Sequence, residues 1–507
     1  MVRFDAHPKG GGMDQINAEL GKETMVVLPC GPVIGRRRGG VTAFHRVPYA
    51  MAPIGPRRFA VPVPPAPWSA PRDCTRPGPM PPQLPSRLAK VMGDYDCAQD
   101  EDCLHLDIWV PADAGKGTPV FVFLHGGAFM TGGGSMPCYD GHALAEASGM
   151  IVVTVSYRLG ALGFLPIAGI APANLGLHDQ LAALRFVREA APALGGDPET
   201  ITVAGQSAGA YSIALMLANG LGRDLFRRAI LMSAPLGLDL PHEGQTADLA
   251  ERYLAALDIA SGDRDALNRV PVAALLRAQA EVARADARQP GDIAPPFLPV
   301  IDGDLVTGDP NAALGAGAAA WCDVVIGSTR EEMAAFYVDN PALAAIGDDV
   351  VAGAFQRAYG AGAAVELEKA RARRAPALPP AVLGDLVTDT LFARPNLDFA
   401  AAQTAHGGAA HAYRFDWQSP MPGVGACHCI DLPFLFGAGE IWLDAPMVAS
   451  ADRREILDLA RLFSGSLAAF AATGDPNRAG LPVWPAFGQA RMVQFFDRLT
   501  EASSPVG

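Results

Sequence analysis

The chain has 507 residues, of which 50% are hydrophobic and 18% are charged, and this globular composition excludes a disordered or fibrous protein. Its 40 basic and 53 acidic residues give a net charge of −13, which argues against nucleic acid or an anionic membrane as a partner. The eight cysteines are too sparse for a disulfide scaffold, and neither a signal peptide nor an apolar run of about 18 residues is evident. We therefore expect a cytoplasmic protein that binds no membrane.

The pattern along the chain predicts an α/β fold. Residues 1–24 are rich in glycine and polar side chains, and we expect a mobile leader there. Apolar patterns then predict strands at 104–110, 119–124, 150–157 and 200–205, with helices at 141–148 and 178–190. Strands that alternate with helices in this way, and that are apolar on both faces, indicate a central, mostly parallel sheet flanked by helices.

Two stretches with helical periodicity interrupt this pattern, near 236–295 and 341–405. Strand-like runs return after each of them, at 323–327 and 412–417. Because the sheet resumes each time, we expect one elaborated domain over residues 25–507. The two helical insertions are predicted to form a lid or cap.

The segment Gly205-Gln-Ser-Ala-Gly209 matches the pattern G-x-S-x-G between a predicted strand and a predicted helix. In that context Ser207 would stand on a sharp turn that projects its hydroxyl from the top of the sheet. The alternative interpretation is an ordinary strand-to-helix turn. The strand context favours a nucleophilic serine.

A second motif, His125-Gly-Gly-Ala-Phe129, follows the apolar strand that ends at Leu124. A Gly-Gly turn at this place can aim backbone N–H groups at an oxyanion, although a simple glycine-rich loop is the alternative. The two motifs occur in the order that one hydrolytic site requires. Together they support that site more strongly than either does alone.

The expected chain order in this type of fold is nucleophile, acid, base. Four histidines follow the serine motif: His242, His406, His411 and His428. His428 is favoured because it lies in a loop beyond the carboxyl end of a predicted strand, where active sites of open parallel sheets are found. For the acid, Glu331 and Glu332 both remain open, and a solvated helix N-terminus is the alternative interpretation of this pair.

Several further segments resemble the type-B carboxylesterase family, the α/β-hydrolases that include the cholinesterases and bacterial para-nitrobenzyl esterases. The matching segments include 101–104 (Glu-Asp-Cys-Leu), 157–164, 195–198 and 470–477. The resemblance implies a serine hydrolase that cleaves carboxylic esters through an acyl-enzyme, without a metal or an organic cofactor. It places the acid at Glu332 and the base at His428, and it assigns an oxyanion hole to Gly127, Ala128 and Ala208, with Gly126 shaping the turn.

The chain departs from the family pattern at three places. Gln206 stands where a glutamate usually precedes the nucleophile, and Met333 stands where a glycine usually follows the acid. Cys103 lacks its usual upstream partner, which leaves a Cys97–Cys103 bridge open. Cys427 and Cys429 flank His428, but no second pair at a zinc-like spacing accompanies them, so we expect no metal site.

The expected substrate is a small-molecule ester without a charge, and the oligomeric state is left open. An amidase or a carbamate hydrolase with the same triad is the main alternative. A non-catalytic adhesion or scaffold relative is disfavoured, because such proteins lose the serine or its partners.

Overall fold

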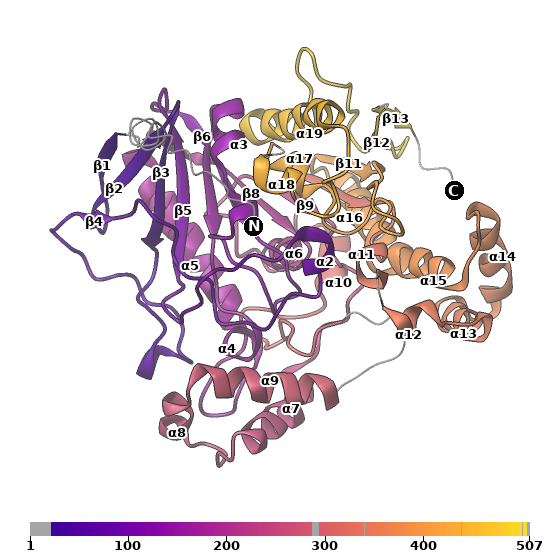
Figure 1. The fold of residues 1–507 in the computed structure, drawn as a ribbon, viewed down its shortest axis with the longest axis horizontal. Helices are drawn as coiled ribbons and strands as arrows, with labels where there is room; N and C mark the ends of the chain where they lie inside the picture. The colour runs from indigo at the N-terminus through magenta and orange to yellow at the C-terminus, as the bar shows by residue number, and fades with distance from the viewer. Residues whose placement is uncertain (1–21, 286–293, 339, 438, 499, 504–507) are drawn as a thin grey trace, which may run out of the picture.

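The computed structural model describes residues 22–285, 294–338, 340–437, 439–498 and 500–503, and its described strands form a single sheet (Figure 1). The order across the sheet is β1-β2-β3-β5-β7-β6-β8-β9-β10-β11-β12-β13, with β4 paired to β2 at the side. The strands span Glu23–Leu28 (β1), Gly31–Arg38 (β2), Val41–Pro48 (β3), Arg72–Asp73 (β4), His105–Pro111 (β5), Thr118–Leu124 (β6), Ile151–Val155 (β7), Gly196–Gln206 (β8), Arg228–Met232 (β9), Asp323–Thr329 (β10), Ala410–Phe415 (β11), Val493–Phe496 (β12) and Glu501–Ser503 (β13).

The centre of the sheet is parallel and its two sides are antiparallel. Every pairing from β7 through β6, β8, β9, β10 and β11 to β12 is parallel. Strands β1, β2, β3, β5 and β7 pair antiparallel, as do β12 and β13. Because the carboxyl ends of parallel strands meet at one edge, the segments after β6, β8, β10 and β11 are brought together there.

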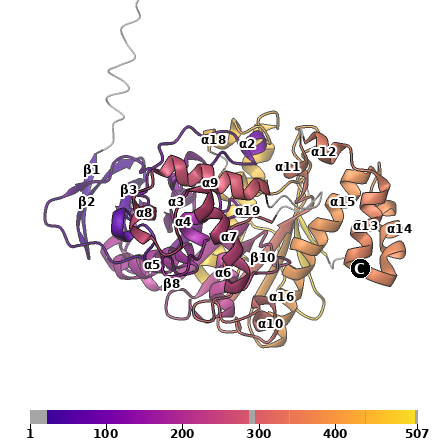
Figure 2. The same cartoon turned by 90° about the horizontal axis from the view of Figure 1, so that it is seen from below.

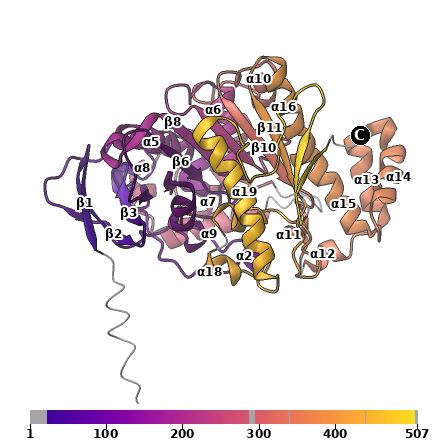
Figure 3. The ribbon, with the colours of Figure 1, turned by 90° about the horizontal axis from the view of Figure 1, so that it is seen from above.

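Helices cover both faces of the sheet, and the alternation of side chains in β6 shows how. Val120, Val122 and Leu124 point into a core shared with α5 (Leu175–Ala190) and α6 (Ala208–Ala218). Phe121 and Phe123 point to the other face, into a core shared with α3 (His142–Ser148) and α19 (Arg453–Thr473). Figure 3 shows α19 lying across the sheet. The amino-acid sequence of a strand that is buried on both faces is therefore one continuous apolar run.

Helix α19 alone among the described helices is long and apolar enough to span a membrane by length and composition. More than half of its apolar window, 56%, is buried within the molecule. Leu459, Phe463 and Phe470 from this helix belong to the core under the sheet. We therefore interpret α19 as a core helix.

Helical segments occupy both predicted insertions (Figure 2). The first holds α7 (Glu243–Ala256), α8 (Arg264–Arg269) and α9 (Val272–Ala285), while 286–293 lie outside the described residues. The second holds α12 (Pro341–Ala344), α13 (Asp348–Tyr359), α14 (Ala363–Arg373), α15 (Pro379–Val387), the π-helix η5 (Thr388–Ala393) and α16 (Arg394–Ala405). Helices α13, α14 and α15 share a small apolar core of their own, so they form a distinct lobe at the side of the sheet.

Short helices lie in the connections: α2 (Ala89–Met92), α4 (Gly160–Phe164), α10 (Pro310–Gly315), α11 (Ala334–Tyr337), α17 (Leu432–Leu435) and α18 (Glu440–Leu443).

The amino-terminal prediction needs a correction. Residues 1–21 of the expected leader lie outside the described residues, but Glu23 and Thr24 already belong to β1. They pair with Arg36 and Gly35 of β2, so backbone hydrogen bonds to a neighbouring strand order this end of the segment. The sheet thus begins before the predicted boundary at residue 25.

Candidate active site

Ser207 occupies a strained turn between β8 and α6. Its backbone has φ 54° and ψ −120°, a conformation that a non-glycine residue adopts only where the surroundings enforce it. A Cβ atom on Gly205 would lie 2.6 Å from the carbonyl carbon of Gly209, and one on Gly209 would lie 2.0 Å from the oxygen of Leu124. The strand and the helix therefore approach as closely as glycine allows. This geometry is that of a nucleophile turn rather than an ordinary connection.

The loop after β6 lies against this turn. A Cβ on Gly126 would be 3.1 Å from the Cβ of Ser207, and one on Gly127, whose φ is 108°, would be 2.0 Å from the oxygen of Thr131. The N–H groups of Gly127 and Ala128 make no hydrogen bond to another described residue. Ala208 begins α6, so its N–H also lacks a partner within the helix. The structure thus brings together all four residues predicted for the oxyanion hole.

His125 packs against this loop. Its Nδ1 lies 2.7 Å from the carbonyl oxygen of Gly126, and its ring stacks on Tyr157 with centroids 4.3 Å apart. Complete burial lowers the pKa of His125 to about 4, because a charged ring would lose its hydration. The imidazole is therefore neutral at physiological pH and holds the loop in place.

His428 and Glu332 form a buried pair. The Nδ1 atom of His428 donates a hydrogen bond to Oε2 of Glu332 over 2.5 Å, and the two side chains are 2% and 0% exposed. The other carboxylate oxygen of Glu332 accepts a hydrogen bond from the N–H of Thr329, 2.8 Å away. Both residues follow the carboxyl ends of neighbouring parallel strands, β10 and β11. His428 and Ser207 line the same pocket.

The remaining candidate histidines lie elsewhere. His242 precedes α7, His406 follows α16, and His411 lies within β11. None of the three lines the pocket that contains Ser207 among the described residues. His428 is therefore the histidine that the fold brings to the serine.

The alternative interpretation of Glu331 and Glu332 as a solvated helix terminus is wrong for both. The Glu332 side chain is fully buried, and the Glu331 side chain is only 12% exposed. The carboxylate of Glu331 accepts hydrogen bonds from Nη1 of Arg374, at 2.7 Å, and from the N–H of Ala426, at 2.9 Å. Only Glu332 contacts His428 through its side chain.

Gln206 makes a contact that the sequence reasoning missed. Its side-chain amide donates a hydrogen bond to Nε2 of His428 over 3.1 Å, and both side chains are buried. The Ser207 hydroxyl makes no hydrogen bond to His428 in this arrangement. The amide thus occupies Nε2, the imidazole nitrogen that does not face Glu332. The one signal in the sequence was the unusual glutamine before the nucleophile.

Comparison with known proteins identifies the chain. The model of the carboxylesterase family matches residues 22–503. The chain belongs to the carboxylesterase family. This membership establishes a carboxylic ester hydrolase with a serine hydrolase mechanism and the α/β-hydrolase fold, as the sequence motifs predict.

Its relatives cover nearly the whole chain. It is 38% identical to a probable N-octanoylanthranilate hydrolase of Rhodococcus erythropolis, over 91% of this chain and 94% of the relative. It is 36% identical to the para-nitrobenzyl esterase of Bacillus subtilis, over 91% of this chain and 92% of the relative. The solved structure of the Geobacillus stearothermophilus carboxylesterase Est55 superposes with a TM-score of 0.83 at 34% identity, covering 95% of this chain and 97% of that one.

Aromatic side chains flank the histidine of this family member. The rings of Phe336 and Phe392 lie with their centroids 5.5 and 5.3 Å from that of His428. Both rings line the pocket that contains Ser207. Each comes from a different insertion or loop, so no local motif could reveal them.

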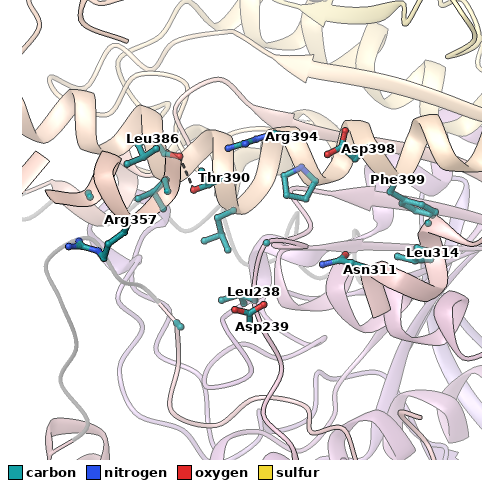
Figure 4. A pocket seen from close by; sticks show the side chains of 18 of the residues that line it. Leu238, Asp239, Asn311, Leu314, Arg357, Leu386, Thr390, Arg394, Asp398 and Phe399 are labelled. Atoms are coloured by element: carbon teal, nitrogen blue, oxygen red, sulfur yellow. Dashed lines mark hydrogen bonds between the residues drawn. The ribbon is translucent and has the colours of Figure 1, made fainter. Parts of the chain in front are cut away.

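A cavity of about 1050 Å³ lies next to the catalytic pocket, and Leu238 and Leu391 line both spaces. Figure 4 shows Thr390 and Arg394 along one wall, with Asp239 facing them from the other side. The wall consists of the continuous helical run α15–η5–α16 from the second insertion. Leu238 and Leu391 thus stand between the small pocket that contains Ser207 and this larger space.

Buried ionisable groups surround His428. Tyr413 donates a hydrogen bond to Asp431 over 2.8 Å, and burial raises the pKa of Asp431 to about 7. Burial also raises the pKa of the thiols of Cys427 and Cys429 on either side of His428. Both thiols are therefore protonated at neutral pH. The described residues contain no cluster of three or more His, Cys, Asp or Glu side chains suited to a metal.

Proposed function

We propose that Ser207, His428 and Glu332 are the catalytic triad of this ester hydrolase. The observation that carries the proposal is the buried Glu332–His428 pair in the same pocket as the strained Ser207 turn. The carboxylate fixes the imidazole so that Nδ1 carries the proton and Nε2 is the base. The N–H groups of Gly127, Ala128 and Ala208 are proposed to bind the oxyanion.

The reaction follows from these roles. His428 first exchanges its Gln206 partner for the Ser207 hydroxyl, takes that proton, and lets the oxygen attack the ester carbonyl. The developing oxyanion gains about 3–4 kcal/mol from each well-placed N–H donor. His428 then protonates the departing alcohol, and water repeats the sequence on the acyl-enzyme. In this scheme Glu332 stabilises the protonated imidazole without accepting its proton.

We propose a carboxylic ester as the preferred substrate, with an amide as the second candidate. The amide is a candidate because the relative from Rhodococcus erythropolis is a probable N-octanoylanthranilate hydrolase, and N-octanoylanthranilate is an N-acyl compound. A carbamate remains an alternative within the same chemistry. A panel that presents one acyl group as an ester, an amide and a carbamate, with the same aryl leaving group, tests this ranking. We expect kcat/KM for the ester to exceed that for the amide by at least about 100-fold, since the amide nitrogen must be protonated as it leaves; an amide that is cleaved faster overturns the ranking.

We further propose that the alcohol part of the substrate carries no positive charge. No acidic residue is among the described residues that line the pocket with Ser207. Gln206 is neutral where a glutamate would attract a cation. The hydroxyl of Tyr95 donates a hydrogen bond to the carbonyl oxygen of Met92, and the residue lies outside this pocket. The net charge of −13 acts only at long range, because salt screens it within about 10 Å.

The prediction is a preference for a neutral ester over acetylcholine. We expect kcat/KM for 3,3-dimethylbutyl acetate, the uncharged isostere, to exceed that for acetylcholine by about tenfold or more, because the ammonium group would lose hydration and meet no acidic side chain among the described residues of this pocket. Gln206→Glu should move the ratio toward acetylcholine, while the ester with no charge serves as the control for triad geometry. Faster hydrolysis of acetylcholine by the natural chain would refute the idea.

The cytoplasmic location is likewise proposed. The eight cysteines are free thiols, including Cys97 and Cys103, which suits a reducing compartment. Cell fractionation tests it, and activity recovered only outside the cytoplasm would contradict it.

A further inference from the structure

The carboxylate of Glu331 connects two parts of the molecule that the triad chemistry does not explain. One oxygen accepts the N–H of Ala426 in the loop that carries His428. The other oxygen accepts a hydrogen bond from Nη1 of Arg374, which follows α14 in the helical lobe α13–α15. Glu331 itself is the neighbour of the triad acid. It therefore lies between the lobe, the acid and the base.

The His428 loop is shaped to receive this carboxylate. Gly425 has φ +57°, and a Cβ atom there would lie 2.1 Å from Oε2 of Glu331. The backbone N–H of Glu331 also donates to the carbonyl oxygen of Ala426 over 2.9 Å, and Glu331 forms an isolated parallel bridge with Cys427. The backbone and the side chain of Glu331 thus both bond to Ala426, two residues before His428.

Arg374 is in turn held by a second carboxylate. Its Nε donates to Asp385 of α15 over 2.7 Å, and its Nη2 donates to the other oxygen of the same carboxylate. This fork is the bidentate geometry that fixes a guanidinium most firmly. The bond to Asp385 raises the pKa of Arg374 above its usual value. Arg374 is therefore a fixed cation that reaches from the lobe to Glu331.

We propose that Glu331, held by Arg374, is a positioning residue for the catalytic base. By fixing the loop at Ala426, it sets the place of His428 relative to Glu332 and Ser207. A misplacement of about 1 Å between reacting groups can cost on the order of 100-fold in rate, so a small shift of this loop would reach the chemical step. The inference rests on the triad roles proposed above.

The test compares four single variants and one double variant with p-nitrophenyl acetate as the substrate. Glu331→Ala removes both acceptor oxygens, Glu331→Gln keeps one for Ala426, and Arg374→Met removes the lobe contact. Arg373→Met is the matched control, because Arg373 is an exposed arginine one residue away, whereas the described partners of the Glu331 carboxylate are Arg374 and Ala426. The double variant Glu331→Gln/Arg374→Met measures whether the two residues act together. Thermal unfolding of each variant separates stability from catalysis.

We expect kcat to fall by about 10- to 100-fold in Glu331→Ala and by about 3- to 10-fold in Arg374→Met, with KM within about twofold of the natural value. Arg373→Met should keep its kcat, and the double variant should be no slower than the slower single variant. A lowered unfolding temperature with unchanged kcat in the folded variants would overturn the proposal, because it would make Glu331 a mere anchor of the lobe. Should Glu331→Ala fail to fold, kcat of Arg374→Met decides in the same way.

Failure of the triad proposal gives a different result. If the Ser207→Ala variant hydrolysed the ester as well as the natural chain does, the triad would be refuted before any Glu331 variant is compared. Normal dependence on Ser207 together with unchanged kcat in the Glu331 and Arg374 variants would refute only the positioning role.

Discussion

Replacing Ser207 or His428 by alanine is expected to lower kcat for an ester by about 10⁴- to 10⁶-fold, because each change removes a group that takes part in bond making or proton transfer. The double variant should be scarcely slower than either single one, since members of a triad act as a unit. Steady-state hydrolysis of p-nitrophenyl acetate by the purified variants provides the comparison.

The control for this prediction is His411→Ala. His411 lies within β11 and outside the catalytic pocket, so its loss should leave KM unchanged and act on stability. If His428→Ala kept most of the activity while another histidine variant lost it, the assignment of the base would be wrong.

Glu332→Gln is expected to lower kcat by about 10³- to 10⁴-fold with little change in KM. The amide can still accept the Thr329 N–H through one oxygen, and its NH₂ group then faces Nδ1 of His428. A donor at that place favours the tautomer with the proton on Nε2, which cannot take a proton from Ser207. The kinetic constants for one ester, measured alongside those of Glu331→Gln, test this.

The ranking of the two variants is decisive. Glu331→Gln changes a residue that acts through the loop, so its effect should be much smaller than that of Glu332→Gln. The opposite ranking would mean that Glu331 is the triad acid, in conflict with the 2.5 Å contact between His428 and Glu332.

The central strands could be predicted from the sequence because burial on both faces leaves a local signal. The apolar runs at 119–124 and 150–157 correspond to β6 and β7, which pair in parallel register. The antiparallel strands β1 to β3 differ: β1 has a short apolar run at 25–28, but Met25 and Val27 are exposed. Arg36, Arg37 and Arg38 end β2, and pairing between strands rather than an apolar pattern orders this part.

The same distinction holds at the site. Ser207 and the Gly126–Ala128 turn stand in short motifs whose glycines are required by local close approach. His428 could be placed from the order of elements. The contact between Gln206 and His428 joins residues 222 positions apart, and that between Glu331 and Arg374 joins residues 43 apart. No local pattern contains such pairs, so only the folded chain reveals them.

Trapping the acyl-enzyme shows which residue is the nucleophile. A p-nitrophenyl ester acylates quickly because its leaving group is good, so rapid acid quenching during the first turnover should capture the intermediate. We predict that mass spectrometry finds one acyl group on the peptide that contains Ser207, and none on the Ser207→Ala chain. Release of p-nitrophenol by the natural chain with the acyl group on another residue would contradict the account.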